Sequence, residues 1–596
     1  NDTIALINFF TGVIFSFFCI SFHGDVSIAA FPLSLIFNAV FFYIAYVLFL
    51  KKQRTGLLLT VNRFYQYQPF VYITSFVLQR AGKTGGCPFA IDLISVILWV
   101  IVLVTSVYIS YKLNEKRAYS LCKEWAEWRK ANPPVKAKGA KRVIIEILEW
   151  VDAIVQAVYI ILLVNIFIFQ LYEIPSESMV PEFLIKDRVI VFKTLAGPKF
   201  PLSEVGLPYG QKYKRGDIVV LRNPHYADDW QSEVKTVLSN FVSMITLTKV
   251  QINRDENGDI KADPLVKRIC GEPGEQLLMM DGKLYARTAE NPEFKKVDTD
   301  EKFAAWDLNP LSSAMKKRIE RIPMSRENVQ ATLDVEEARR NLDISLAAIE
   351  CKSLADEFDL YAKGTDVSES QYKTLLSGND LYEYNLFNNI NDTSVKLLTS
   401  DGGRQWFRKF LTSWTNLPAP LHTYSEKSGA VTGNELVGGD LYSDSNFRLN
   451  VMAKLYFGRL VLINARRIVN DVPLSEIMNN TEFKNAFADI EKLNVYLVCL
   501  DQRNMPLFPA NDASGNAQYI PENCYFMMGD NRYNSLDLRH SMDPSIKALS
   551  ASDPSSFMYV SYMEPQYLNK KYIIGKPIYR YLPLGRTGAL KKKNAN

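Results

Sequence analysis

The sequence predicts a membrane protein in which N-terminal transmembrane helices precede a mostly β extracytoplasmic domain with a large helical insertion. Nearly all long apolar runs lie in the first 172 residues, and a hydrocarbon core of about 30 Å needs roughly 20 such residues as a helix. Beyond them, apolar residues form short runs typical of strands, and a region of helical periodicity separates two groups of these runs. The length of 596 residues fits several units better than one compact domain.

The composition excludes several classes of function. Lys and Arg number 69 against 64 for Asp and Glu, so the net charge of +5 is too small and too dispersed for nucleic-acid binding. The seven cysteines include no Cys-x-x-Cys pair, which excludes a disulfide framework and a cysteine-based zinc site. A Ser-His-Asp enzyme would have to take its base from four histidines outside any recognisable motif: His23, His225, His422 and His540.

Four runs are long and apolar enough to be spanning helices: 4–22, 28–50, 90–111 and 151–172. The first two are uncharged, and the others carry only Asp92 and Asp152. For the first run a cleaved signal peptide is the alternative, although the basic stretch that such a peptide needs is missing. The stretch 57–78 contains Arg63, so the sequence leaves open whether it spans the membrane or re-enters it.

The loop between the third and fourth runs, residues 112–142, is dense in Lys and Arg. Under the positive-inside rule this loop is cytoplasmic. The next helix then runs outward, and the chain after residue 172 lies outside the cytoplasm. Lys51, Lys52 and Arg54 would contradict the rule if only four spans existed, so the topology before residue 88 stays open.

Six short runs predict the strands of one β unit: 188–193, 217–221, 276–278, 494–500, 525–528 and 572–578. Between about 296 and 485 apolar residues instead recur every three or four positions, which predicts helices. Two such series are Leu342, Leu346, Ile349, Leu354, Phe358 and Tyr361, and Leu449, Met452, Tyr456, Leu460 and Ile463. A helical insertion is therefore predicted to split the β unit.

Three segments carry residues that can perform chemistry. Residues 174–181 read Ile-Pro-Ser-Glu-Ser-Met-Val-Pro and place two serines where a membrane helix meets the outer surface. Lys267 follows an apolar pair, and a buried lysine can act as a base because burial disfavours its charged form. The third segment, 529–539, combines turn-forming, acidic and arginine residues. Taken singly, each segment is more typical of an ordinary surface loop.

Together the segments resemble bacterial signal peptidase I, the membrane-bound serine peptidase with a Ser/Lys dyad. In that family a membrane anchor is followed by P-S-x-S-M-x-P, R-G-D-[IV]-V, K-R-x-x-G-x-P-G and G-D-N-R-x-x-S-x-D-x-R. All four motifs occur here in this order, the second at 215–219, and the resemblance covers about 172–290 and 490–585. Glu182 and Leu538 depart from the Thr and Ser that are usual in the family.

The resemblance implies a role for each motif residue. Ser178 is the expected nucleophile and Lys267 its general base, working as a neutral amine. Ser176 would join the backbone N–H of Ser178 in the oxyanion hole, and Ser535 would orient the lysine amine. The implied supporting residues are Asp537 paired with Arg539, and Asp530 with Arg532 as loop-fixing residues. No metal or organic cofactor is implied.

The predicted division of the chain follows these features. It consists of a multi-span membrane region at 1–111, a basic cytoplasmic loop at 112–150, an anchor helix at 151–172, catalytic β parts at 173–295 and 486–585, the helical insertion at 296–485 and a basic tail at 586–596. Because all motifs lie outside the insertion, we expect it to be dispensable for cleavage chemistry.

The implied function is removal of signal peptides from exported proteins at the outer face of a bacterial cytoplasmic (inner) membrane. The implied partners are signal-peptide-bearing preproteins, membrane lipid and the secretion machinery, with no nucleic acid. Two alternatives stay open: a related Ser/Lys membrane peptidase with one dedicated substrate, and a catalytically silent envelope protein that binds a partner.

Overall fold

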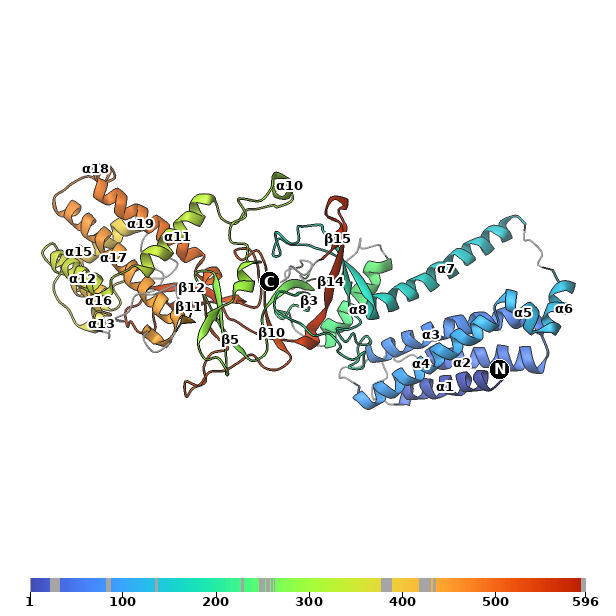
Figure 1. Ribbon diagram of the computed structural model, residues 1–596. Helices are drawn as coiled ribbons and strands as arrows, with labels where there is room; N and C mark the ends of the chain where they lie inside the picture. The colour runs from blue at the N-terminus through green and yellow to red at the C-terminus, as the bar shows by residue number, and fades with distance from the viewer. Residues whose placement is uncertain are drawn as a thin grey trace.

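The computed structural model describes residues 2–21, 33–81, 87–133, 138–226, 230–245, 263–376, 389–416, 430–431 and 436–590, and the single residues 252, 254, 258 and 261. Three parts follow one another along an elongated molecule (Figure 1). Helices from the N-terminal region form one end, β-sheets lie in the middle, and a second group of helices forms the other end. Most of the predicted tail at 586–596 lies outside the described residues, as do His23, His422 and the start of the run 28–50.

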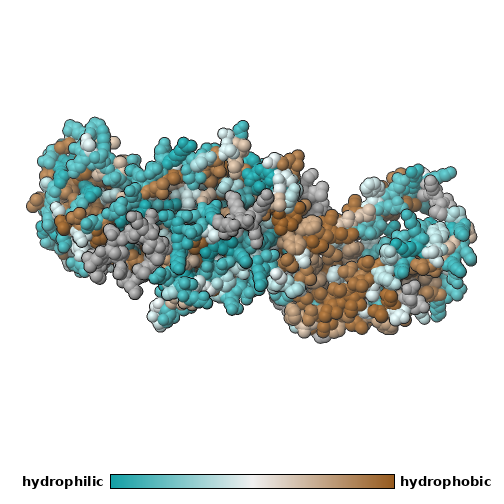
Figure 2. Space-filling view, viewed as in Figure 1, coloured by the Kyte–Doolittle hydropathy of each residue, from teal (hydrophilic) through white to brown (hydrophobic). Residues whose placement is uncertain are grey.

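The long helical segments of the N-terminal part are α1 (Asp2–Ser21), α2 (Leu33–Phe42) with its continuation η2 (Tyr43–Lys51), α3 (Leu58–Ala81), α4 (Phe89–Lys112) and α7 (Ala140–Phe167). Among the described residues, three stretches are long and apolar enough to cross a membrane: Leu33–Lys51, Phe89–Lys112 and Ala140–Phe167. The apolar stretch of α1 is shorter, Thr3–Phe18. Figure 2 shows hydrophobic surface concentrated over this part. These helices mark the chain as a membrane protein.

The stretch 57–78, left open by the sequence, is helical and forms most of α3. α3 runs beside α4 and also contacts α1 and α2 (Figure 1). Its first residue, Leu58, belongs to the same buried cluster as Trp125 of the short helix α6 (Lys123–Ala131). The basic residues just before α3 therefore lie at the same end of the bundle as the basic loop 112–142, as the positive-inside rule requires.

The fourth spanning helix differs from the predicted 151–172. α7 begins at Ala140 and ends at Phe167, and the apolar residues after it form strand β1 (Phe169–Glu173). β1 pairs antiparallel with β2 (Arg188–Phe192). Hydropathy alone does not distinguish the end of a spanning helix from an apolar strand that continues it, so the predicted bounds were wrong at both ends.

The middle part consists of two curled antiparallel sheets and a hairpin. The larger sheet has the order β1-β2-β14-β3-β4-β10-β13 with β15 beside β14, and the smaller has the order β8-β7-β6-β5-β9. The hairpin is formed by β11 (His540–Ala548) and β12 (Met558–Met563). The remaining strands are β3 (Ile218–Leu221), β4 (Leu265–Gly271), β5 (Glu275–Met280), β6 (Lys283–Thr288), β7 (Phe294–Lys296), β8 (Ala430–Val431), β9 (Met505–Phe508), β10 (Cys524–Met528), β13 (Leu568–Asn569), β14 (Ile573–Leu582) and β15 (Gly588–Ala589).

Five of the six predicted strands coincide with β2, β3, β5, β10 and β14. The sixth prediction, 494–500, is wrong, because this segment belongs to the end of α19 (Thr481–Val498) and the start of α20 (Leu500–Arg503). Leu493, Leu497 and Leu500 are all buried. Their spacing of four and three positions is that of one helix face, whereas a strand buries every second residue.

The second group of helices, called the helical unit below, is built around an aromatic core. The rings of Phe358 and Phe407 lie 4.3 Å apart at their centroids, and Phe410 and Phe457 pack beside them. The predicted helical series fall on α12 and α17, although Leu346 and Ile349 are exposed. The principal helices are α11 (Arg326–Arg340), α12 (Ile344–Asp359), α15 (Ile390–Thr399), α16 (Gly403–Thr412), α17 (Leu441–Val469) and α19. Whether the unit is an insertion stays a prediction.

The helical unit and the β-sheets share buried contacts. The loop between β11 and β12 enters the helical core, where Phe557 is buried. Asn450 of α17 donates to Asp553 Oδ2 at 2.7 Å and accepts from the Phe557 N–H at 2.8 Å. Arg503 of α20 donates to both carboxylate oxygens of Glu336 on α11 at 2.8 Å. These contacts indicate that residues 296–485 contribute to stability, and whether cleavage chemistry can proceed without them stays a prediction.

Candidate active site

Both serines of the first motif lie in the loop between β1 and β2. Ser176 is exposed, Ser178 is half-buried, and their hydroxyl oxygens are 3.3 Å apart. The loop is fixed from the C-terminal part of the chain, because the Asn531 N–H donates to Ser178 O at 3.1 Å. The Asn531 side chain also donates to Glu177 O at 3.2 Å. The backbone around Ser178 is therefore held by a residue more than 350 positions away in the sequence.

Lys267 lies in the middle of β4, between β3 and β10. In the ladder with β3 it pairs with Val219, and in the ladder with β10 its neighbour Arg268 pairs with Met528. Continuing the second register by one residue sets Gly529 opposite Lys267. The sheet therefore brings the third and fourth motifs together at one point.

Ser178 and Ser535 both lie against the backbone of Gly529. A Cβ at this position would lie 2.5 Å from Ser178 O and 2.2 Å from Ser535 Oγ, so any side chain would displace one of them. Ser178 and Ser535 thus both approach the backbone opposite Lys267. The glycine of the Gly-Asp-Asn-Arg motif is needed here for close approach of three chain segments.

The Lys267 side chain is buried, with a residue exposure of 2%. Burial lowers its pKa to about 8, while the charge of Asp537 opposes that shift and the charge of Arg539 adds to it. Among the described residues, none forms a hydrogen bond or ion pair with the Lys267 amine. Near neutral pH a usable fraction of this amine is unprotonated, and its lone pair is not engaged.

Asp537 and Arg539 form a buried ion pair beside the lysine. Arg539 Nε and one of its terminal nitrogens each donate to the carboxylate at 2.9 Å. The Asp537 carboxylate also accepts from the Gly529 N–H at 2.9 Å and from the Arg539 N–H at 3.2 Å. Arg539 also donates to Gln502 O in α20 at 3.0 Å. The pair therefore links the Gly529 turn to the helical unit.

Two further buried pairs fix the turn after β10. Arg268 donates to both oxygens of Asp530 at 2.7 and 2.6 Å. Arg532 pairs instead with Asp300 of the short helix α9 (Asp298–Glu301), at 3.0 and 2.6 Å. Asp530 and Arg532, named together from the sequence, thus have separate partners. Each partner comes from a distant part of the chain, so the turn is cross-linked on both sides.

Ser535 contributes a hydroxyl without a fixed partner. Its Oγ is buried and makes no hydrogen bond with any described residue. It lies next to Gly529, where an added Cβ would be 2.2 Å from it. An unsatisfied buried hydroxyl is unusual and is typical of a functional site.

Sequence reasoning missed several residues at this site. Asp300 lies in the region predicted to be dispensable for cleavage chemistry, and no local pattern marks it. Glu177 stands between the two serines, and its side chain accepts from Asn534 at 3.2 Å. Two histidines also lie near the dyad: burial lowers the pKa of His540 to about 4 and also lowers that of His225. Both histidines are therefore mostly neutral at physiological pH.

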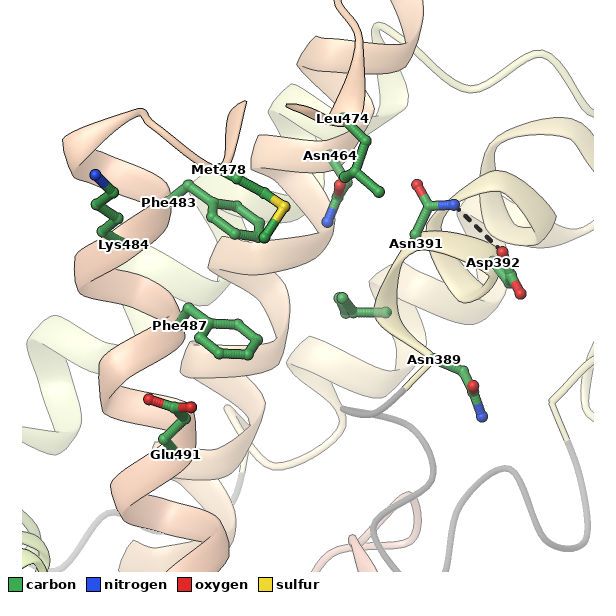
Figure 3. A pocket seen from close by; sticks show the side chains of 11 residues that line it. Asn389, Asn391, Asp392, Asn464, Leu474, Met478, Phe483, Lys484, Phe487 and Glu491 are labelled. Carbon is green, nitrogen blue, oxygen red and sulfur yellow. Dashed lines mark hydrogen bonds between the residues drawn. The ribbon is translucent and has the colours of Figure 1, made fainter. Parts of the chain in front are cut away.

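A cavity in the helical unit does not belong to this site. A cavity of about 500 Å³ lies between α15 and α19, with Phe483 and Phe487 on one wall and Asn391 on the other (Figure 3). None of its lining residues comes from the four motifs. The candidate active site therefore lies in the β-sheet around Gly529 and not in this cavity.

Spanning helices, a curled antiparallel β unit and these motif side chains define a membrane-associated peptidase. The family model described as "Signal peptidase, peptidase S26" matches residues 147–342 and 459–577, more than half of the chain. The chain therefore belongs to this family, and the predicted resemblance to signal peptidase I is confirmed. The match leaves residues 343–458 uncovered, and the helices α12, α15, α16 and most of α17 fall in this range.

Curated relatives agree with the family assignment. Signal peptidase I of Haemophilus influenzae is 24% identical over 179 residues, covering 30% of this chain and 49% of that protein. Signal peptidase I of Bacillus licheniformis is 28% identical over 23% of this chain and 50% of that protein. Signal peptidase I T of Bacillus subtilis is 29% identical over 25% of this chain and 52% of that protein. The chain spans about half the length of these relatives.

Proposed function

We propose that this protein is a signal peptidase I that removes signal peptides from exported preproteins, with Ser178 as nucleophile and Lys267 as general base. The observation that carries the proposal is the convergence at Gly529, where Ser178 and Ser535 approach the backbone opposite the buried lysine. Family membership supports the reaction class, and the relatives are named for this activity.

In the proposed reaction, the neutral Lys267 Nζ accepts the proton of Ser178 Oγ as the oxygen attacks the scissile carbonyl carbon. The protonated amine then donates that proton to the leaving amine, and an acyl-serine remains. Lys267 next takes a proton from the water that attacks the acyl carbon, and the ammonium returns this proton to Ser178 Oγ as the acyl–oxygen bond breaks, which regenerates both groups. Burial of the lysine supports this role because it keeps a usable fraction of the amine unprotonated.

The oxyanion of the tetrahedral intermediate would be bound by the Ser178 N–H and the Ser176 hydroxyl. No described residue accepts a hydrogen bond from the Ser178 N–H, and the Ser176 hydroxyl lies 3.3 Å from that of Ser178. Donors already oriented toward developing charge need no reorganisation during the reaction, and each contributes roughly 10²- to 10³-fold in rate.

The supporting residues position the dyad. Ser535 would donate to or accept from the lysine amine, since its hydroxyl is unengaged next to Gly529. Asp537 with Arg539, Asp530 with Arg268, and Arg532 with Asp300 would hold the turn rigid. We also propose that the helical unit is an insertion into the family domain, because the family match is interrupted within it.

The proposed location is the cytoplasmic membrane of a bacterium, with the catalytic part outside. Two observations support this orientation. The loop 112–142 is basic, and it lies at one end of α7 while the β unit lies at the other end (Figure 1). Single cysteines test it in a background without native cysteines. Ser514→Cys, in an exposed turn, should react with a membrane-impermeant thiol reagent in intact cells, whereas Ser120→Cys should not. The reverse pattern would contradict the orientation.

The activity is tested by incubating the detergent-solubilised full chain with a labelled preprotein, beside the Ser178→Ala variant. Cleavage at the end of the signal peptide by the wild-type protein alone is the expected result. A survey of several unrelated preproteins separates the general enzyme from one with a dedicated substrate. If the folded wild-type protein cuts none of them, the proposed activity is wrong.

A further inference from the structure

A segment inside the region predicted to be dispensable for cleavage chemistry lies against the loop that carries Ser178. This segment, residues 305–322, is called the strap below and contains the short helix α10 (Ser313–Lys316). Its apolar side chains pack against Val180 and Leu184, which are completely buried. The strap therefore packs along one side of the Ser178 loop.

The strap is also bound to the turn that follows Gly529. The Ala305 N–H donates to Asp530 O at 2.7 Å, and the Ala305 carbonyl accepts from the Arg532 N–H at 3.2 Å. The same turn supplies Asn531, which holds the backbone of the Ser178 loop. The strap and the Ser178 loop therefore share one support.

The carboxylate of Glu177 links the strap directly to the Ser178 loop. Its Oε1 accepts from the Glu320 N–H of the strap, and its Oε2 accepts from Asn534 Nδ2 at 3.2 Å. Glu177 is only 7% exposed. A buried carboxylate is costly unless it accepts hydrogen bonds, and here both of its oxygens do so. The two contacts therefore fix the position of the Glu177 side chain.

The backbone of Glu177 sets the direction of the Ser178 N–H. The Glu177 carbonyl accepts from Asn531 Nδ2 at 3.2 Å and from the Val180 N–H at 3.0 Å. In a planar trans peptide, the C=O and the N–H of the next residue point in opposite directions. Holding this carbonyl therefore also holds the Ser178 N–H, which is the donor assigned above to the oxyanion.

We propose that Glu177 is a positioning residue, which ties the strap to the Ser178 loop and thereby keeps the Ser178 N–H aimed at the oxyanion. The inference rests on the proposed function and adds a residue at the position that the first motif leaves open between its two serines. It also assigns part of the region 296–485 to the active site. An oxyanion donor acts in the transition state, so loss of this positioning should lower kcat more than it raises KM.

Substitution of Glu177 in the detergent-solubilised full chain tests the proposal. Glu177→Ala removes both acceptors, and we expect kcat for a preprotein to fall roughly 10- to 100-fold with KM within about twofold, since deleting an oxyanion donor outright costs about 10²- to 10³-fold. Glu177→Gln is the conservative variant. Its Oε1 still accepts from the Glu320 N–H, and its amide donates to Asn534 once that amide turns over, so kcat should recover to within about threefold of wild type. A change in KM alone, or an equal loss of kcat in both variants, would overturn the proposal.

A transition-state analogue separates positioning from a loss of stability. A peptide aldehyde with the cleavage-site sequence adds to Ser178 Oγ and places its oxygen where the oxyanion forms. Glu177→Ala should weaken inhibition by this aldehyde by the same factor as it lowers kcat, with circular dichroism to verify the fold. A merely structural role would lower the melting temperature without this parallel, and unchanged inhibition in a variant with reduced kcat would contradict the proposal.

A second pair of variants leaves Glu177 in place, so it applies even if Glu177→Ala does not fold. Glu320→Pro removes the N–H that binds Glu177, whereas Glu320→Ala keeps it. We expect kcat to be at least about fivefold lower in Glu320→Pro than in Glu320→Ala, because only the first variant releases the strap from the carboxylate. Equal kcat in the two folded variants would contradict the positioning role. A wild-type enzyme that cuts no preprotein contradicts the proposed function instead.

Discussion

Two buried lysines, Lys267 in the β-sheet and Lys454 in the helical unit, differ in whether their amines have hydrogen-bond partners. Burial lowers the pKa of Lys267 and that of Lys454 to about 8 in each case. Lys454 of α17 is fully engaged, donating to Phe410 O at 2.6 Å and to Ser413 Oγ at 3.0 Å and pairing with Asp553 at 2.5 Å. Lys267 has no such partner among the described residues.

The comparison teaches that a shifted pKa alone does not identify a base. The charge of Asp537 favours the protonated form of Lys267, but the Asp537 carboxylate is paired with Arg539 and forms no hydrogen bond with the lysine. Asp553 instead binds Lys454 directly and joins it to the β11–β12 loop. Lys454 joins parts of the helical unit through its hydrogen bonds, whereas the Lys267 amine in the sheet is left without a hydrogen-bond partner among the described residues.

The largest expected effect is on preprotein cleavage, which should be lost on substitution of Lys267 but not of Lys454. Ser178→Ala and Lys267→Ala should each reduce preprotein cleavage by about 10⁴-fold or more, and the double variant should be little worse, because the two groups act as one unit. Single-turnover assays measure this loss. Lys454→Ala is the control. This variant should be less stable, but the molecules that fold should cleave with normal kcat. Near-normal activity in Lys267→Ala, with loss on substitution of His225, would exclude the Ser/Lys assignment.

The next effect concerns the dependence of the sheet site on a distant residue. Asp300→Asn leaves the buried Arg532 without its charged partner, which should destabilise the protein by about 3–5 kcal/mol and lower activity. The exposed neighbour gives the control, since Glu301→Gln removes only a surface pair with Lys296. Thermal unfolding in detergent, together with cleavage rates, checks both. Equal stability of the two variants would mean that the pair does not hold the turn.

Stability should change in opposite directions at the two lysines. The pKa of Lys267 in the folded state is below its ordinary value of 10.5. Burial of the protonated amine therefore lowers the free energy of unfolding at pH 7. Lys267→Met should therefore stabilise the protein by up to about 3 kcal/mol at pH 7, with the gain disappearing as pH rises through 8 to 10.5. Lys454→Met should destabilise it by about 3 kcal/mol, since Asp553 loses its cation. Unfolding curves at pH 7 and 10 would refute the comparison if both variants shifted in the same direction.

The smallest effect is the pH dependence of the proposed base. Because only the neutral amine accepts the serine proton, kcat/KM should rise about tenfold per pH unit below the pKa of about 8 and level off above it. Rates measured from pH 6 to 10, with circular dichroism to verify the fold, test this. A profile that is flat over this range would argue against a lysine base.

The sequence by itself determined the family, the spanning character of the N-terminal part and the motif residues. Spanning helices were recognisable because their apolar runs are long and continuous, and the motifs because their residue order is dense and local. The wrong prediction for residues 494–500 also has a local cause. Residues 494–500 are apolar and short enough to fit a strand, and only their burial on one face of α19 decides for a helix.

Only the tertiary structure decided what surrounds the dyad. The turn at Gly529, the pairing of Asp300 with Arg532, and the link from Arg539 to Gln502 join residues up to hundreds of positions apart. No local pattern encodes such pairs, since they depend on how strands and helices pack. The same holds for Lys267 and Lys454, which no local pattern separates as free base and packed ion pair. The burial and partner that decide between them are properties of the folded chain.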